Sequence, residues 1–486
     1  MGLLEASTWT GQVFIDGWEP GGGGDYAVME PATGGELGRI GKATPADVSR
    51  AAARATEAQR GWAATPYEQR AAIMRRAGDL WNEHAEEVQG WIIREAGSIP
   101  PKAQLETWFA GNACYEAAGL ASLPYGELLQ TREPRLSMAR RLPVGVVGVI
   151  SPFNVPLILS IRAVAPALAL GNAVILKPDP RTAVCGGATL AAIFSEAGVP
   201  EGVFSMLPGG VDVGEALVTD PNVQMISFTG STRAGRAVGA LAGQHLKRSH
   251  LELGGNSALI VLDDVDLDKA ASVGAWGSFL HQGQICMATS RHLVQRDIAE
   301  AYGAKLAEKA EHLPVGNPAT DQVALGPIID EHQRDHIHEV VTATVNAGAH
   351  LAAGGTFEGL FYRPTVLTDV PTDAPAFAQE IFGPVAPITP FDSIDDVVKM
   401  AADTEYGLSL GILTRDVMKG MELADRIPSG NVHINDQTVS DEVVNPFGGV
   451  KDSGPGARLG GPQANLESFT TVQWLTMRGE MPFYPF

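Results

Sequence analysis

Residues 143–177 read PVGVVGVISPFNVPLILSIRAVAPALALGNAVILK, and the fold class can be inferred from them. Two short β-rich runs, VGVVGVI and NAVILK, flank an apolar segment of helix length. Strands that are apolar along their whole length are typical of a parallel sheet whose two faces are both covered. A crossover of helix length is what joins two neighbouring parallel strands. We therefore predict a strand–helix–strand unit and an α/β fold.

The alternation of β-rich runs and helix-length segments continues along the rest of the chain. The first series adds GVFSML, QMISF and ALIVL, and a second series between about residues 285 and 435 contains RHLVQ, ALGPIID, VAPITPF, GILT and NVHIN. The final segment, SFTTVQWLTMRG, alternates apolar and polar residues like an edge or exchanged strand. This pattern predicts two parallel-sheet units followed by one terminal strand.

The first 123 residues are expected to be mainly helical after a short strand and a flexible turn. A helix is predicted to start at Thr44-Pro45, since threonine caps helices and proline suits the first turn. A longer amphipathic helix is predicted for residues 67–95, ended by Gly97 and Pro100, and another for about 103–123.

Charge and cysteine content limit the partners and the compartment of the protein. Its 486 residues include 35 basic and 56 acidic side chains, a formal net charge of −21, which argues against nucleic acid or an anionic membrane as a partner. The most apolar stretch, residues 144–176, is interrupted by prolines, so no membrane span is expected. Cys114, Cys185 and Cys286 form neither a disulfide framework nor a zinc motif, and no signal peptide is evident. We expect a cytoplasmic protein.

Three short segments carry residues that suit acyl chemistry, although each also has a structural explanation. HQGQICMATSR (281–291) contains Cys286, whose thiolate would be a strong nucleophile, while a lone cysteine is more often a buried packing group. LELGGNSALIVLDD (251–264) contains Glu252, either a general base with a pKa raised by burial or a carboxylate that caps a turn. GVVGVISPFNVPL (145–157) presents Asn154 between two prolines, as an oxyanion donor or as a turn residue.

In this order and spacing, the three segments resemble the aldehyde dehydrogenase superfamily, and the resemblance covers essentially the whole chain. Further motifs typical of the superfamily are KPDPRTAV (177–184), SFTGSTRAG (227–235), QEIFGPV (379–385) and NPFGGVKDSGPG (445–456). The segments GSFLHQGQICMATSRHLV, HLKRSHLELGG and NVHINDQTV are most similar to its aromatic branch, the benzaldehyde, vanillin and salicylaldehyde dehydrogenases.

The resemblance implies a covalent mechanism without a metal. Cys286 would attack the aldehyde, while the Asn154 amide and the Cys286 backbone N–H stabilise the oxyanion. Hydride transfer to a nicotinamide would leave a thioester, and Glu252 would activate the water that releases the acid. Lys177 belongs to the same catalytic set, and Glu467 matches a position that assists the proton relay.

The resemblance also implies a cofactor site on the first, Rossmann-like sheet, although the chain has no GxGxxG fingerprint. Lys177 would contact the cofactor ribose, and Gly230 and Ser231 would lie near the pyrophosphate. Glu380 would hold the nicotinamide ribose, with Phe382 beside the ring. The complete set of implied cofactor-binding residues is Ser151, Lys177, Pro180, Arg181, Gly210, Gly214, Phe228, Gly230, Ser231, Glu380 and Phe382.

One departure from the family bears on cofactor choice. Many members that prefer NAD carry a glutamate three positions after the lysine of the KP motif, but this chain has Pro180 there, followed by Arg181. Proline cannot accept hydrogen bonds from ribose hydroxyls, and an arginine can pair with a 2′-phosphate. We therefore hypothesise that the enzyme uses both NAD and NADP, with a possible leaning toward NADP.

The expected substrate pocket is mostly apolar, which suits a flat aromatic ring. Arg162 stands where other branches often have an aromatic residue; it either binds a phenolate or carboxylate substituent or pairs with an acidic residue. Oxidation of an aromatic aldehyde is the leading function. The alternatives are a semialdehyde or aliphatic aldehyde dehydrogenase, and a non-catalytic binding protein that retains the fold. The expected lining residues are Val155, Ile158, Leu159, Arg162, Ile285 and Met287.

We expect three structural parts. A cofactor-binding domain would comprise residues 1–120 and 144–251, an α/β catalytic domain residues 252–450, and a small β oligomerisation element residues 121–143 and 467–486. By resemblance the protein would be a homodimer or homotetramer. His332 and His336 are spaced like metal ligands on one helix, but without a further ligand motif they indicate a solvated helix face.

Overall fold

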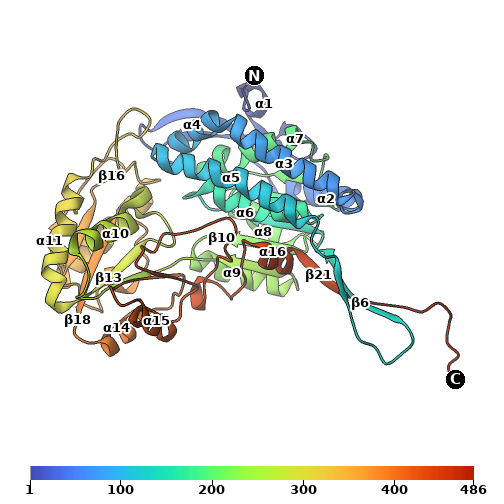
Figure 1. Cartoon of the computed structure of the whole chain (residues 1–486). Helices are drawn as coiled ribbons and strands as arrows, with labels where there is room; N and C mark the ends of the chain where they lie inside the picture. The colour runs from blue at the N-terminus through green and yellow to red at the C-terminus, as the bar shows by residue number, and fades with distance from the viewer. Residues whose placement is uncertain (1) are drawn as a thin grey trace.

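Two lobes, each built on a parallel sheet, and a projecting arm of three antiparallel strands make up the chain (Figure 1). The structure is a computed structural model, and it describes residues 2–486. We call the lobe that carries the N-terminal helices the first lobe, and the lobe built from about residues 257–435 the second lobe. The α/β architecture predicted from the sequence is confirmed.

The first sheet has the strand order β11-β10-β7-β8-β9-β1-β2. Strands β7 to β11 are parallel, and the hairpin β1–β2 is antiparallel to β9. All residues of β7 and β8 are buried, which explains their uniformly apolar sequence. The strands are β1 (Gln12–Phe14), β2 (Trp18–Pro20), β7 (Val146–Ile150), β8 (Ala173–Lys177), β9 (Phe204–Met206), β10 (Met225–Thr229) and β11 (Arg248–Glu252).

This strand order creates a switch point between β7 and β10. The chain builds outward from β7 through β8 to β9, and then returns to place β10 and β11 on the other side of β7. Loops that leave the carboxyl ends of β7 and β10 therefore diverge and leave a crevice, which is where open α/β sheets bind ligands. The predicted residues Ser151, Asn154, Gly230 and Ser231 all lie on these two loops.

Helices cover both faces of the first sheet. Thr44 caps α2 as predicted, since its side chain and that of Asp47 each accept a bond from the other's backbone N–H. Among residues 2–486, no helix is long and apolar enough to cross a bilayer. The helices are α1 (Ala6–Trp9), α2 (Pro45–Ala64), α3 (Tyr67–Glu83), α4 (Ala85–Glu95), α5 (Pro100–Leu120), α6 (Pro156–Ala169), α7 (Thr189–Ala197), α8 (Val211–Thr219) and α9 (Thr232–Gln244), with a 3-10 turn (Pro180–Thr182) and a π-helical turn (Val184–Ala188).

The predicted single helix over residues 67–95 is wrong, because α3 and α4 are separate. His84 between them has φ −104° and ψ 15°, which interrupts the helix. Trp81 and Val88 are both buried on the same stripe, so the apolar periodicity runs across the break without revealing it. Gly97 and Pro100 do lie beyond the end of α4 at Glu95, as predicted, and Pro100 also occupies the first turn of α5, where proline is tolerated.

The second sheet has the order β14-β17-β18-β13-β12-β19-β20, with only β14 antiparallel. Its strands are β12 (Ser257–Val261), β13 (Thr289–Gln295), β14 (His350–Ala353), β17 (Thr365–Thr368), β18 (Val385–Phe391), β19 (Ser409–Leu413) and β20 (Asn431–Ile434). Its helices are α10 (Leu267–Phe279), α11 (Arg296–His312), α12 (Glu331–Asn346), α13 (Pro375–Ala378), α14 (Ile394–Ala402) and α15 (Val417–Arg426). Two-stranded ribbons are β3 (Asp25–Glu30) with β4 (Gly35–Gly41), and β15 (Phe357–Glu358) with β16 (Phe361–Tyr362).

ALGPIID (324–330) does not form the strand that its apolar character suggests. Apart from an isolated bridge at Leu325, the segment is irregular. Leu325 and Ile328 are buried, and the backbone of Pro327 and Ile329 bonds to side chains of the loop that carries Cys286. The segment is apolar because it packs beneath that loop.

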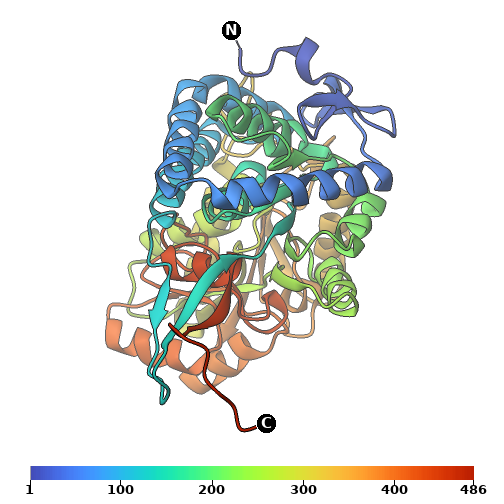
Figure 2. The same cartoon turned by 90° about the vertical axis from the view of Figure 1, so that its right-hand side faces the viewer.

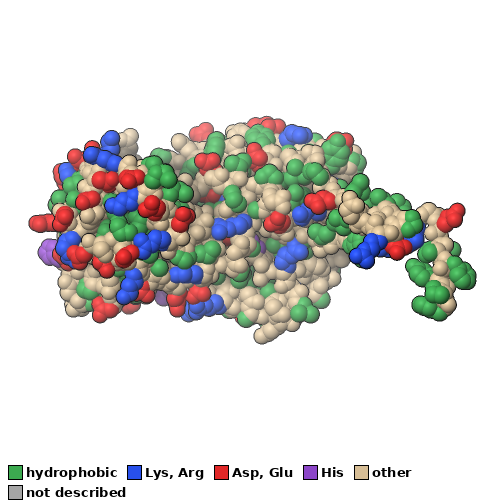
Figure 3. Space-filling model, turned by 60° about the horizontal axis from the view of Figure 1, so that its bottom comes forward, with side chains coloured by type: hydrophobic (Ala, Val, Ile, Leu, Met, Phe, Trp, Pro, Cys, Tyr) green, Lys and Arg blue, Asp and Glu red, His purple; other side chains and the backbone are tan. Residues whose placement is uncertain are grey.

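The arm joins distant parts of the sequence (Figures 1 and 2). Strand β6 (Leu136–Pro143) pairs along its whole length with β21 (Thr470–Met477), and β5 (Gly126–Leu128) lies on the other side of β6. The predicted terminal edge strand is confirmed. Helix α16 (Pro462–Phe469) precedes β21, and an exposed tail follows it. Figure 3 shows the arm and tail projecting, with hydrophobic side chains on their surface. The exposed large apolar residues of these segments include Leu128, Val472, Trp474, Met477, Met481, Phe483, Tyr484 and Phe486.

Candidate active site

A strained turn presents Cys286 just before β13. His281 and Gln282 both have positive φ, 48° and 56°, which non-glycine residues rarely adopt. Gln282 stabilises the turn, because its amide donates to the backbone oxygens of Gly97 (3.1 Å) and Pro327 (2.9 Å). Cys286 is partly exposed, whereas Cys114 and Cys185 are buried. Of the three cysteines, Cys286 is thus the one that a ligand can reach.

The surroundings of Cys286 favour the neutral thiol. Burial raises the pKa of Cys286 to about 12, and the nearby carboxylates of Glu380, Glu252 and Asp441 add to this effect. A thiolate is the reactive form of cysteine. At neutral pH the thiol therefore keeps its proton until a base removes it, which makes the adjacent carboxylates part of the chemistry.

Gly254 and Gly255 allow three site residues to approach one another. A side chain at Gly255 would overlap the backbone carbonyl of Cys286, and one at Gly254 would overlap the carboxylate of Glu380. The Gly255 backbone N–H donates to Glu380 Oε1 at 3.0 Å. Burial nevertheless raises the pKa of Glu380 to about 7. The glycine pair of the LELGG motif therefore brings Cys286 and Glu380 to the end of β11, where Glu252 lies.

Glu252 is the last residue of β11 and is buried. Burial raises the pKa of its carboxyl group, and this is opposed by His250 and by the positive charges of Arg162 and Arg458. A side chain at Gly448 would lie 2.9 Å from Glu252 Oε1, so that glycine leaves room for the carboxylate. A buried carboxylate with a raised pKa has the character of a general base.

Asn154 is tied directly to the cysteine loop. Its side-chain Nδ2 donates to the backbone oxygen of Gln284 at 2.8 Å, two residues before Cys286. Asn154 is itself buried. No second hydrogen bond from this amide group occurs within residues 2–486, so one N–H remains to meet a ligand oxygen. The structure therefore brings together Cys286, Asn154 and Glu252, as the sequence predicted.

A buried ion pair that the sequence did not indicate holds the Asn154 loop. Lys102 and Glu106, both on α5, form this pair beneath the loop. Lys102 Nζ donates to the backbone oxygen of Asn154 at 2.8 Å, and Glu106 Oε2 accepts from the backbone N–H groups of Leu157 (3.0 Å) and Ile158 (3.4 Å). Glu106 thus satisfies the open amino end of α6, where a negative charge is favourable. In the sequence, the i,i+4 spacing of Lys102 and Glu106 is the same as that of an ordinary ion pair on a helix surface.

Several residues predicted to bind a dinucleotide lie at the carboxyl ends of strands of the first sheet. Lys177 ends β8, and burial lowers the pKa of its amino group. Gly230 and Ser231 precede α9, and the Ser231 side chain accepts only from Ala234 N–H at 3.3 Å. Other N–H groups in the first turn of α9 remain open, and a helix N-terminus of this kind suits a pyrophosphate. These residues fit a nicotinamide dinucleotide.

Four further predicted cofactor residues, Ser151, Gly210, Gly214 and Phe228, lie on or next to β7, α8 and β10. Ser151 follows β7, and its N–H bonds to the Lys177 oxygen at 3.1 Å. Gly210 caps α8, and a side chain at Gly214 in that helix would come within 3.7 Å of Lys177. Phe228 is buried in β10, and its ring lies close enough to Gly230 to exclude a side chain there.

Arg181 is already engaged by protein groups. Its guanidinium pairs with Asp179 (2.9 Å) and Asp330 (2.7 Å) and lies 4.1 Å over the ring of Phe153. Phe382 packs edge-on against the same Phe153 ring, with 5.9 Å between ring centroids. A 2′-phosphate would have to compete with two carboxylates for Arg181, which weakens the part of the cofactor hypothesis that rests on this residue.

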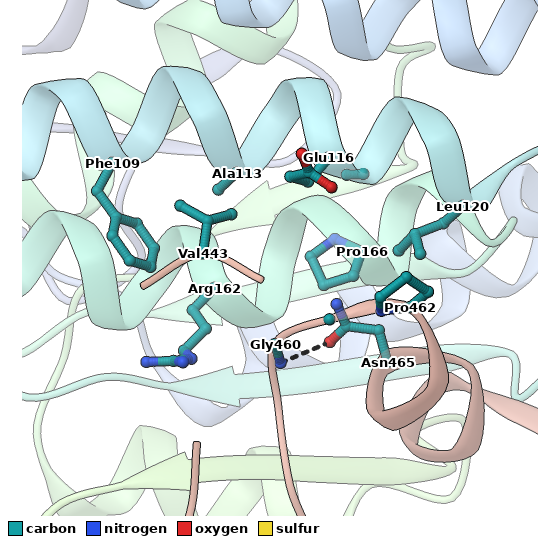
Figure 4. A pocket seen from close by; sticks show the side chains of 12 residues that line it. Phe109, Ala113, Glu116, Leu120, Arg162, Pro166, Val443, Gly460, Pro462 and Asn465 are labelled. Atoms are coloured by element: carbon teal, nitrogen blue, oxygen red, sulfur yellow. Dashed lines mark hydrogen bonds between the residues drawn. The ribbon is translucent and has the colours of Figure 1, made fainter. Parts of the chain in front are cut away.

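Arg162 pairs with an acidic residue, the second of its two predicted roles. Both its terminal nitrogens bond to Asp441, one of them at 2.9 Å from Oδ1. The guanidinium also lies 4.6 Å over Phe447 and 5.9 Å from the ring centre of Phe109. Figure 4 shows Arg162 and Phe109 at one end of a cleft between α5, α6 and the C-terminal segment. Neither Cys286 nor Glu252 lines this cleft.

The other predicted lining residues fall into two groups. Ile285 and Met287 are buried beside Cys286 and pack with Phe447. Val155 and Leu159 on the α6 side are partly exposed, and Ile158 is buried. Phe447 and Asp441 were missed as lining residues, although Phe447 lies within the motif NPFGGVKDSGPG.

Two weaker predictions involve residues on the surface. Glu467 is exposed and accepts a hydrogen bond from Gln463, whereas Glu252 is buried. His332 is exposed and His336 half-buried on α12. No group of three or more His, Cys, Asp or Glu side chains within residues 2–486 is arranged to hold a metal ion.

The fold and the site define an α/β oxidoreductase in which a reachable cysteine stands beside a dinucleotide-binding sheet. The chain belongs to the aldehyde dehydrogenase family, whose model matches residues 18–475. It is 64% identical over 486 residues to vanillin dehydrogenase of Amycolatopsis sp., covering 100% of both chains. It is 50% identical to benzaldehyde dehydrogenase (NAD(+)) of Pseudomonas putida, covering 99% of each.

A solved structure gives the same result. The crystal structure of a salicylaldehyde dehydrogenase from Pseudomonas putida G7 complexed with salicylaldehyde matches with a TM-score of 0.94 at 32% identity, covering 98% of this chain and 99% of that one. The predicted family and the likeness to its aromatic branch are confirmed. The chain is an NAD(P)-dependent dehydrogenase that acts on aldehydes.

Proposed function

We propose that the protein oxidises aromatic aldehydes to carboxylic acids through a thioester on Cys286. The observation that carries this proposal is the hydrogen bond from the Asn154 amide to the Gln284 backbone oxygen. This bond fixes an oxyanion donor to the loop that carries the cysteine. Preorganised donors of this kind are usually the largest single contribution to acyl-transfer catalysis.

In the proposed reaction, an adjacent carboxylate takes the proton of Cys286 and releases it to solvent, and Sγ forms a bond to the aldehyde carbon. The resulting oxyanion is held by the Asn154 amide and the Cys286 backbone N–H. The nicotinamide, when bound, supplies the acceptor for the hydride that leaves this carbon. Glu252 then takes a proton from water, whose oxygen attacks the thioester carbon. The C–S bond breaks, the acid is released, and Cys286 regains its proton.

Three observations support an aromatic substrate. The relatives with the highest identities reported above act, by name, on vanillin and benzaldehyde. Phe447, Ile285 and Met287 surround Cys286 with apolar surface, which suits a ring. The charge of Arg162 is balanced by Asp441, so this arginine offers no free cation to an aldehyde that carries a carboxylate. A semialdehyde substrate is disfavoured on the last ground.

We propose that both NAD and NADP are used. Pro180 removes the carboxylate that would bind the ribose hydroxyls and repel a 2′-phosphate. The pairing of Arg181 with Asp179 and Asp330 opposes a strong preference for NADP. The ratio of kcat/KM for the two cofactors tests this. A preference for NAD above about 100-fold, roughly 2.7 kcal/mol, would contradict it.

We also propose a cytoplasmic homodimer or homotetramer that assembles through the arm. The three cysteines are unpaired, and the arm and tail expose large apolar side chains that an interface would cover. Light scattering on the purified protein gives the mass directly. A monomeric mass at micromolar concentration would contradict the proposed oligomer.

The test of the catalytic proposal is the initial rate of reduced-cofactor formation. Benzaldehyde, vanillin, salicylaldehyde, succinic semialdehyde and hexanal are compared in the wild type, in Cys286→Ala and in Cys114→Ala, a buried cysteine that serves as the matched control. We expect turnover of the aromatic aldehydes to be fastest and to be lost only in Cys286→Ala. Faster turnover of succinic semialdehyde or hexanal would overturn the aromatic assignment, and activity in Cys286→Ala would overturn the mechanism.

A further inference from the structure

A histidine stands beside the proposed general base on the same strand. His250 and Glu252 are two residues apart in β11, so their side chains project from the same face. Nε2 of His250 lies 3.3 Å from Oε1 of Glu252, and both side chains are buried, at 2% and 6% exposure. Neither the ring nitrogens nor the carboxylate oxygens have a hydrogen-bond partner of regular geometry among residues 2–486. The two groups are therefore available to each other.

The other charged groups near Glu252 are committed elsewhere. Arg162 is bound to Asp441. The guanidinium of Arg458 donates to the backbone oxygens of Gly430 (3.2 Å) and Gly448. Both arginines act on Glu252 through their charge. His250 is thus the neighbour whose nitrogen is close to this carboxylate and is not committed to another group.

A purely structural role does not account well for this arrangement. A buried histidine that serves packing normally satisfies its ring nitrogens, as His292 does with Ser278 (2.8 Å) and Tyr302 (2.8 Å). Both nitrogens of His250 lack such partners within the described chain, as do those of His281, but His250 also has a carboxylate oxygen 3.3 Å from its Nε2. The cost of leaving them unsatisfied is offset if the ring serves the carboxylate beside it.

We propose that His250 is a positioning residue for Glu252: the Nε2–H of His250 faces the carboxylate and favours the charged form that takes a proton from the hydrolytic water. This inference rests on the proposed function. In the step concerned, the water proton passes to Glu252 while His250 Nε2–H faces the carboxylate, the water oxygen bonds to the thioester carbon, and the C–S bond breaks. Release of the acid returns one proton to Cys286, so no other reactant is needed.

The pH dependence of turnover separates this role from packing. His250 lowers the pKa of Glu252 against the effect of burial. Removing the ring in His250→Leu therefore raises that pKa, and the acidic limb of the kcat profile moves to higher pH. At neutral pH we expect kcat to fall about tenfold, with a burst of reduced cofactor because hydrolysis has become slow. His250→Gln keeps an N–H donor and should recover part of the rate.

A double-mutant cycle locates the effect. If His250 acts through Glu252, adding His250→Leu to Glu252→Gln should change kcat less than twofold further. His245→Gln, an exposed histidine at the end of α9, is the control and should match the wild type. An unshifted pH profile in His250→Leu, or in His250→Gln if the first variant does not fold, would overturn the inference. Absence of aldehyde turnover in the wild type would instead overturn the proposed function.

Discussion

Two ion pairs lie next to the site, one on α5 and one that includes Arg162 of α6, and they differ in what they contact. Lys102–Glu106 lies in the interior and bonds to the backbone of the Asn154 loop and to the first turn of α6. Arg162–Asp441 is partly open, with Asp441 16% exposed, and contacts the rings of Phe109 and Phe447.

The difference indicates two separate tasks. The interior pair positions the oxyanion donor, because both of its side chains are hydrogen-bonded to the backbone of the Asn154 loop and of the first turn of α6. The outer pair shapes and neutralises the surface that a substrate meets. One pair should therefore govern the rate and stability, and the other should govern which aldehyde binds.

The largest effect is expected from Glu106→Gln. It leaves Lys102 without its carboxylate in a buried site, and breaking a buried pair costs about 3–5 kcal/mol. We expect Tm to fall by several degrees and kcat to fall about 100-fold, since the Asn154 loop loses its support. Calorimetry and steady-state kinetics measure both quantities. Unchanged kcat in a folded variant would show that the pair does not position the loop.

A smaller effect, on specificity, is expected from Asp441→Asn. The variant leaves the charge of Arg162 unbalanced, so KM for succinic semialdehyde should fall by about tenfold. The KM for benzaldehyde should change less than about threefold, because the apolar contacts remain. If KM changes equally for both aldehydes, the outer pair acts on the fold, and the distinction between the two pairs is lost.

The smallest effect is expected from an exposed pair of the same chemistry. Arg76 and Glu83 lie 2.6 Å apart, and both are more than 40% exposed. Exposed pairs contribute little because solvent screens them. Glu83→Gln should leave Tm within about 1 °C and kcat unchanged. A loss of Tm and kcat comparable to that of Glu106→Gln would mean that burial does not explain the difference between the ion pairs.

Much of this site could be predicted from sequence, because its central residues sit in contiguous motifs. Cys286, Glu252 and Asn154 each follow a strand or turn that the local pattern identifies, and the structure brings all three together. The supporting residues could not be found in this way. Lys102 reaches Asn154 across 52 positions, and Arg162 reaches Asp441 across 279, so only the folded chain reveals these partners.

The errors in the predicted fold have a similar origin. Burial alone made ALGPIID look like a strand, although it packs beneath the cysteine loop. The apolar stripe on α3 and α4 continues past His84, so periodicity could not locate the break. In both cases the hydrophobic pattern reported burial correctly and the backbone conformation wrongly.

The most direct test of the account is to trap the covalent intermediate in Glu252→Gln. The variant is mixed with benzaldehyde and NAD, quenched in acid, digested and examined by mass spectrometry. We predict a benzoyl group on the peptide that contains Cys286, formed together with one equivalent of reduced cofactor. Reduced cofactor without an acylated Cys286, or acylation of Cys114 or Cys185 instead, would contradict the thioester mechanism.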